Sequence, residues 1–135
     1  MKILFPLWPV LIISIMLGCS PQPEAVIKFC DSLDQNEQCQ TDRDHFRLGE
    51  RVYVSLESNS SFETKRINGN IYRLTEDMKI PLSNKYFDLE EGDTFISQSI
   101  PFHEFGQEAI GTFSIEFTDE NDQVIAKREL IISRE

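Results

Sequence analysis

Basic residues are scarce in this chain of 135 residues. It contains 13 Lys and Arg against 23 Asp and Glu, which gives a formal charge of −10. A nucleic-acid-binding surface needs clustered Lys and Arg to displace counterions, so this balance argues against a nucleic-acid binder. Disorder is excluded by composition instead, because ten Phe, three Tyr and 40% hydrophobic residues can bury a core. The length corresponds to a single domain.

Groups that carry enzyme chemistry are also few. The chain has two His and three Cys, and it lacks the Gly-x-Ser-x-Gly, Ser-x-x-Lys and His-Glu-x-x-His motifs. His45 follows two acidic residues, Asp42 and Asp44, in a segment that we expect to be a solvated loop, and no nucleophile accompanies it in the sequence. We therefore predict that the protein is not an enzyme, that it has no catalytic residue and that it needs no cofactor.

A metal site is not expected either. The acidic cluster at Asp119–Asp122 lacks the spacing of an EF-hand loop, and it lies between two alternating segments, where Asn and Asp favour a hairpin turn. Further acids lie within residues 30–44, where they would either contact a basic partner or keep an exposed loop soluble.

Long hydrophobic runs are absent after residue 17. The run Ile3–Leu17 is shorter than the roughly 20 residues of a membrane-spanning helix, and Pro6 and Pro9 interrupt its first half. It follows the positive charge of Lys2. This arrangement predicts an export signal that is removed.

The end of this segment, Met16-Leu17-Gly18-Cys19, resembles the lipobox of bacterial lipoproteins. The resemblance implies that Cys19 receives a diacylglycerol, that cleavage occurs just before it, and that the new amine is acylated. Met16 and Leu17 depart from the usual residues of the motif. Several acyl chains on Cys19 would form a firm membrane anchor. The alternatives are an ordinary secretory signal and an uncleaved anchor.

By the same resemblance, Ser20 after the modified Cys favours the outer membrane, facing the periplasm. Removal of residues 1–18 takes away Trp8 and Lys2 and leaves a charge of −11 on 117 residues. Residues 19–24 would be the lipidated Cys and a Pro-containing linker, and residues 25–135 the folded domain.

The two remaining cysteines, Cys30 and Cys39, form an even pair in an exported protein, which predicts a disulfide. A closed loop of this size stabilises a fold by roughly 2–3 kcal/mol. Metal binding would need further Cys or His ligands, and a redox site would need two intervening residues.

Apolar and polar residues alternate in seven segments after the linker, as is typical of strands. Asn68-Gly69 could form a hairpin turn, but the flanking strands would be very short. We therefore expect one strand there, with Gly69 at a bulge or a close approach. Phe113, Ile115 and Phe117 should face inward. The expected strands are 25–29, 51–56, 66–74, 85–89, 94–100, 112–118 and 123–133.

These segments predict an all-β fold, a single immunoglobulin-like antiparallel β-sandwich of about seven strands. The stretch Gly111–Ile115 resembles the start of the sixth strand of immunoglobulin-like domains. Phe113 replaces the Tyr of the tyrosine corner, and Cys30 and Cys39 are too close in sequence for the inter-sheet disulfide of antibodies. The resemblance supports an architecture and no receptor role.

Four residues are candidates for binding a partner: Phe102, His103, Phe105 and Phe62. Pro101 and Gly106 bracket two of the Phe residues, which cannot both follow the inward face of a strand. At least one should either cover an open end of the sandwich or project as an aromatic anchor. Phe62 poses the same choice at another loop.

These features predict a membrane-anchored, periplasm-facing lipoprotein that acts as a non-enzymatic protein-binding or accessory module of an envelope assembly. One alternative is a small inhibitor of a protease or cell-wall hydrolase, because Gly49–Leu56 followed by Asn59 weakly resembles the opening of BsuPI-type proteinase inhibitors. The other alternative is a lipoprotein that binds a small ligand or a cation.

Overall fold

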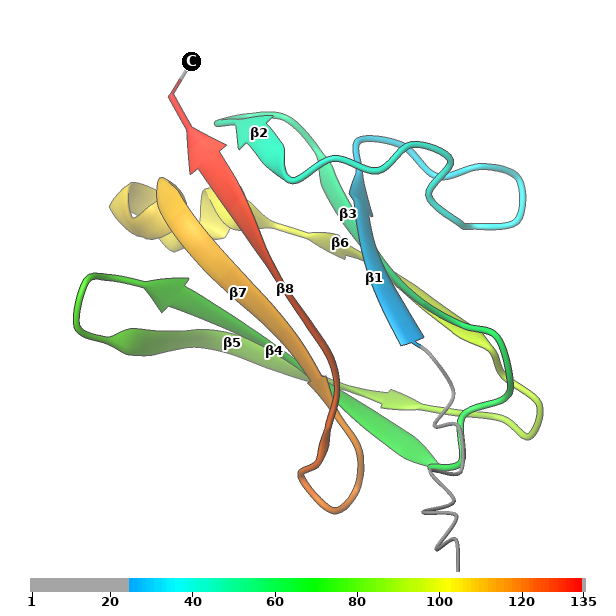
Figure 1. Ribbon diagram of the computed structural model, residues 1–135. Coiled ribbons are helices and arrows are strands. Elements are labelled where there is room, and N and C mark those ends of the chain that lie inside the picture. Colours follow the sequence, from blue (N-terminus) through cyan, green and yellow to red (C-terminus); the bar gives the residue numbers. More distant parts are fainter. Residues whose placement is uncertain (1–24, 135) are drawn as a thin grey trace, which may run out of the picture.

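The computed structural model describes residues 25–134, and of residues 107 and 108 only the backbone. The predicted signal and linker, with Cys19, lie outside these residues. The described part of the chain forms eight strands and one 3₁₀-helix (Figure 1). They are β1 (Ala25–Cys30), β2 (His45–Arg47), β3 (Val52–Ser58), β4 (Arg66–Leu74), β5 (Lys79–Asp88), β6 (Phe95–Ile100), η1 (Phe102–Ala109), β7 (Gly111–Thr118) and β8 (Val124–Ser133).

The strands form two sheets, which confirms the predicted immunoglobulin-like sandwich. One sheet has the order β1-β3-β6, and the other has the order β2-β8-β7-β4-β5. Every pairing is antiparallel except that of β2 with β8. The smaller sheet corresponds to the four-stranded sheet of an immunoglobulin constant domain with its last strand missing, because β5 connects to β6 through residues 89–94 alone.

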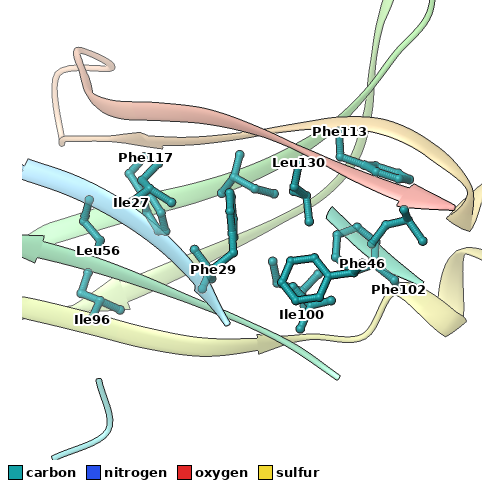
Figure 2. Close-up of a cluster of buried hydrophobic side chains, with 14 of the residues drawn as sticks. Ile27, Phe29, Phe46, Leu56, Ile96, Ile100, Phe102, Phe113, Phe117 and Leu130 are labelled. Atoms are coloured by element: carbon teal, nitrogen blue, oxygen red, sulfur yellow. The ribbon is translucent and has the colours of Figure 1, made fainter. Parts of the chain in front are cut away.

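The core lies between the two sheets and is rich in Phe (Figure 2). Phe113, Ile115 and Phe117 face inward from β7, as the alternation of that segment predicts. Their burial, with that of residues from the opposite sheet, supplies the main stabilisation of the fold. The largest fully buried hydrophobic side chains are Phe29, Phe46, Phe113, Leu56, Ile67, Ile115, Leu130 and Ile132.

Strand β5 starts earlier than predicted. The expected strand 85–89 is in fact Lys79–Asp88, paired along its whole length with β4. The register shifts opposite Ile71 and Tyr72, and Pro81 lies next to this shift. Most of β5 is exposed because it is the edge of its sheet. Ile80 and Leu82 do alternate with more exposed residues in its first half, but Pro81 between them weakens the strand signal.

Two further elements were not predicted. His45 lies in the short strand β2 instead of a loop, and three residues are too few to show alternation. The segment after Pro101, expected as a loop, forms the helix η1 with a kink at Gly106, whose φ of 61° is one that glycine adopts without strain. The predicted turn at Asp119–Asp122 is confirmed: the Asp119 carboxylate accepts the N–H groups of Asn121 and Gln123.

Gly69 lies within one continuous strand, so the hairpin reading of Asn68-Gly69 is wrong and the single strand is confirmed. A Cβ atom at this position would lie 3.1 Å from Phe117 Cε1 and 3.2 Å from Phe87 Cε2. The two rings therefore pack directly over the backbone of β4, as the predicted close approach requires.

The substitution Gly69→Ala should destabilise the protein by about 1–2 kcal/mol. The methyl group would be overpacked against the two rings, and this destabilises the folded state by more than the reduced conformational freedom of the unfolded chain stabilises it. Ser83→Ala, on the exposed β5 strand beside it, should change the free energy of unfolding by less than about 0.5 kcal/mol. Urea denaturation of both variants measures this. Equal stability of the two would show that the rings leave room for a methyl group at Gly69.

The predicted disulfide between Cys30 and Cys39 is present, with a Cα–Cα distance of 5.6 Å. It fixes the segment that follows β1 against the free edge of that strand. There the Phe29 N–H donates to Asp42 Oδ1 at 3.1 Å, and the Phe29 C=O accepts the Arg43 N–H at 3.0 Å. Arg128 donates to the Ile27 C=O at 2.9 Å. The outer edge of β1 is thus closed to other strands.

Candidate functional site

The first candidate site is an apolar cavity of about 290 Å³ between the two sheets, which we call the side cleft. It opens on the side of the sandwich where β5 and β6 are the edge strands. In Figure 1 these strands leave a shared turn and continue into different sheets. The apolar part of its lining is supplied by core side chains, chiefly Val54, Ile71, Ile100, Ile115 and Phe117.

Two polar side chains cross the side cleft. Lys85 stands opposite Gly69 on the inner face of β5, and Gln98 stands opposite Val54 on the inner face of β6. The Lys85 ammonium donates to Gln98 Oε1 at 2.9 Å, and Gln98 Nε2 donates to the Ser99 C=O at 3.2 Å. This pair is the direct polar link between the two edge strands, and the sequence analysis did not identify either residue.

The second candidate site is a cavity of about 400 Å³ at the η1 end of the sandwich, which we call the end pocket. His103 lines it together with Arg47, Arg51 and Tyr53. Local cationic groups are notable in a chain with an excess of acids. The two Arg residues were not singled out in the sequence, because Arg47 ends a strand of only three residues and Arg51 begins the predicted strand 51–56 with no chemical motif around it.

The two cavities meet along the end of β6. Ser99, Ile100 and Pro101 line both of them. A molecule bound along β6 could therefore place groups in the side cleft and in the end pocket together. This shared border is the feature of the described residues that best fits a binding surface.

Phe102, one of the four predicted partner-binding residues, covers the core. It is only 5% exposed, and its ring centroid lies 4.9 Å from that of Phe113 (Figure 2). Phe105 is half-buried and packs edge-on against Phe102, with centroids 5.7 Å apart. Of the two roles considered for this segment, the structure therefore shows the cap and not the projecting anchor.

The other two predicted residues differ in exposure. Phe62 is half-buried against the core, and its N–H donates to the Asp93 C=O at 3.0 Å. His103 is exposed and borders the end pocket. The structure does not bring the four residues into one exposed patch, and their contact with a partner stays a prediction.

Glu50 is the residue near the end pocket whose ionisation is altered by its surroundings. The Arg47 N–H donates to Glu50 Oε1 at 2.8 Å, and the Arg43 guanidinium forms an ion pair with Oε2. The Arg47 hydrogen bond, and after it the Arg43 guanidinium, lower the pKa of Glu50 below its ordinary 4.5. The carboxylate thus fastens the turn between β2 and β3.

A pH dependence follows from this lowered pKa. The stabilisation that Glu50 supplies is present above the ordinary pKa of 4.5 and is lost as the pH falls through the lower pKa of the folded state. Wild type should exceed Glu50→Gln in stability at pH 7 by a small margin, because the group is partly exposed. This difference in stability should vanish at a pH well below 4.5. Urea titrations of both proteins at pH 7 and at that acidic pH measure it. A difference that grows in acid would contradict a lowered pKa of Glu50.

Most of the acidic clusters seen in the sequence have structural partners. Asp34 Oδ1 accepts the N–H groups of Asn36 and Gln38, and Glu120 Oε1 accepts the Lys65 N–H at 2.7 Å. Within residues 25–134, no three His, Cys, Asp or Glu side chains are grouped so that they could hold a metal ion.

His45 makes one contact of a kind that is also found in catalytic sites. Its Nε2 lies 3.0 Å from Ser133 Oγ, at the exposed pairing of β2 with the end of β8. A catalytic triad also needs a carboxylate on the other ring nitrogen, and the nearby Asp44 lies 4.0 Å from Arg128 instead. No described carboxylate lies within hydrogen-bonding distance of that nitrogen. The geometry therefore shows a Ser–His pair without a carboxylate to orient the ring.

No helix in the described part of the chain is long and apolar enough to cross a membrane. No model of a known protein family matches this sequence, and no curated protein is significantly similar to it.

Proposed function

We propose that this protein is a periplasm-facing, membrane-anchored lipoprotein that binds another protein as a non-enzymatic module of an envelope assembly. The observation that carries the proposal is the meeting of the side cleft and the end pocket along β6. A surface with an apolar cavity bordered by a few polar groups is typical of a binding site.

The surroundings of the chemically capable groups support a binding role. Asp42 bonds the edge of β1, Glu50 fastens a turn, and the buried Glu116 forms an ion pair with Lys79. Each of these carboxylates is engaged in holding the fold. The segment that resembles an inhibitor motif contributes to β3, the central strand of its sheet, whose edges are both paired.

The proposed anchor would hold the domain close to its membrane. Five residues separate Cys19 from Ala25, the first residue of β1. The charge of −11 on the mature chain would repel an anionic lipid surface, so the lipid and not electrostatic attraction would keep the protein in place. The sandwich would then be free to turn its open side toward a partner.

Photo-cross-linking in the intact envelope tests this proposal. A photoreactive amino acid placed at Ser99, between the two cavities, should give a discrete adduct with one protein. The matched control is Val124, which is 57% exposed at the start of β8 in the other sheet and borders neither cavity.

An adduct of defined size from Ser99 and none from Val124 supports the proposal. Equal labelling at both positions, or no protein adduct at Ser99 in cells that contain the full-length lipoprotein, would overturn it.

A further inference from the structure

We propose that the free edge of β6 binds an extended peptide strand of the partner, which carries apolar side chains at alternate positions and a carboxylate that reaches Lys85. This inference rests on the proposed protein-binding function and adds the mode of binding and the chemistry of the bound segment. It is an addition of one strand to the three-stranded sheet.

The three-stranded sheet has a vacant strand position beside β6. β6 ends the sheet β1-β3-β6, and in the described residues no strand pairs with its other side. An immunoglobulin constant domain has a fourth strand at this place. Here residues 89–94 turn directly from β5 into β6, so the chain itself leaves the position open beside the side cleft.

Alternate backbone groups of β6 point to its free edge. The Ser58 N–H donates to the Thr94 C=O at 2.8 Å, which makes this a hydrogen-bonded pair. In an antiparallel pair, hydrogen-bonded and non-hydrogen-bonded residues alternate. The backbone N–H and C=O groups of residues 96, 98 and 100 therefore point toward β3. Phe95, Ser97 and Ser99 therefore direct their N–H and C=O groups to the free edge.

The same reasoning on β1 provides a check. By this alternation, the backbone groups of Ile27 and Phe29 point away from β3. These two residues are indeed the ones that form hydrogen bonds with Arg128, Asp42 and Arg43. At β6, the Ser99 C=O has the Gln98 amide as a partner. Within residues 25–134, the outward N–H groups of Phe95, Ser97 and Ser99 have none.

The other sheet edges are less suited to strand addition. The β1 edge is closed by the three side-chain and loop contacts described above, and β2 has only three residues. β5 contains Pro81, which has no N–H to donate, next to a shift in register. Beyond that shift β5 is regular over residues 83–88, but among the four edge strands only β6 lines both the side cleft and the end pocket.

The two cavities lie where the side chains of an added strand would point. Side chains of a strand alternate between its two faces, so those of an added strand would point by turns between the sheets and outward. The inward ones would enter the side cleft, whose lining is mainly apolar. The outward ones would lie near Tyr53 and Ser99 at the end pocket, and this predicts apolar residues at every second position.

Lys85 brings a positive charge to the side cleft. It is the one charged residue that lines the side cleft, and its ammonium has Gln98 Oε1 as a hydrogen-bond partner. No carboxylate among the described residues lies within 4.0 Å of it. A Lys ammonium has three donors, so a carboxylate on the bound strand complements it.

An inward-facing Lys on an edge strand also discourages pairing between copies of a protein. Lys85 belongs to β5, so this protection applies to the β5 edge, while its ammonium in the side cleft would bind a carboxylate of a strand added to β6. The same residue therefore selects the partner strand and limits self-association.

Peptide selection tests the inference. Phage-displayed random peptides of about ten residues, the upper length of an ordinary strand, are selected on the full-length protein in detergent. Enriched sequences should alternate apolar and polar residues and contain Asp or Glu. Selection on Lys85→Gln should lose the preference for Asp and Glu while the alternation remains.

A matched pair of variants isolates the backbone contact. Ser97→Pro removes the outward N–H without touching a bond to β3, and Pro is tolerated at an edge strand when its missing N–H faces solvent. Ser97→Ala keeps the N–H. The selected peptides should bind Ser97→Ala as they bind the wild type, and Ser97→Pro about tenfold or more weakly, with the same circular dichroism for both variants.

Equal affinity of the two Ser97 variants would overturn strand addition, as would the absence of enriched peptides or of an acidic preference. So would a wild-type protein that is dimeric in detergent while Ser97→Pro is monomeric, because a second copy would then occupy the edge. The cross-linking at Ser99 is independent of these results: an adduct there with a failed selection would leave the proposed function standing and remove only this mode of binding.

Discussion

The substitution Phe102→Ala should destabilise the protein by about 3–5 kcal/mol, a large part of the stability of an ordinary domain. Phe102 is 5% exposed, and its ring packs between Phe105 and Phe113. Its loss would leave a cavity at the end of the sandwich and uncover Phe113. Urea denaturation followed by circular dichroism measures the difference.

The neighbouring residue provides the control. His103 is exposed in the same helix, so His103→Ala should change the free energy of unfolding by less than about 0.5 kcal/mol. If Phe102→Ala were as mild as His103→Ala, the ring would not belong to the core, and its interpretation as a partner anchor would return.

Loss of the disulfide should have the second largest effect. The double substitution of Cys30 and Cys39 by Ala should cost roughly 2–3 kcal/mol, because the unfolded chain regains the freedom of the closed loop. Both residues are buried, and Cys39 anchors the start of the segment that carries Asp42 and Arg43 to the edge of β1. The loss should therefore loosen that edge as well as lower the global stability.

Thermal unfolding with and without a thiol reductant measures this effect. The reduced wild type and the double variant should unfold at similar temperatures, both below that of the oxidised wild type. A double variant as stable as the oxidised protein would show that the loop is held by its other contacts alone.

Sequence periodicity predicted the uninterrupted strands better than the very short or Pro-containing ones. In β7 the three inward residues are buried as expected, and in β4 the close approach of Gly69 was correctly expected. The start of β5 was placed too late because Pro81 interrupts its first half, and β2 was missed because three residues carry little alternation. The disulfide was predictable because the number and spacing of the cysteines left few alternatives.

The alternation of β7 also has a limit. Ser114 and Glu116 lie on its outer face, yet they are 0% and 7% exposed. β7 is flanked by β4 and β8, and the Glu116 carboxylate is covered as it pairs with Lys79, whose ammonium lies 4.2 Å from the centre of the Tyr72 ring. A polar residue in an alternating segment therefore need not be exposed when long side chains of neighbouring strands lie over it.

The candidate site could not be read from the sequence. Lys85 and Gln98 belong to different strands and meet only because the short turn at residues 89–94 sends β6 into the other sheet. Lys85 does share a face with Phe87 in the predicted strand 85–89, and a charge on an inward face was the signal that could have marked it. The free backbone of β6 depends on the absence of a neighbour, which only the fold shows.

Amide hydrogen exchange along β6 is the most direct test of the central claim that this edge binds a strand. In the free protein, Ser97 and Ser99 should exchange fast, and Gln98, whose N–H points to β3, should exchange slowly. A selected peptide should slow Ser97 and Ser99 and leave Gln98 unchanged. Exchange at Ser97 and Ser99 that is already slow in the free protein, or that the bound peptide does not change, would contradict the account.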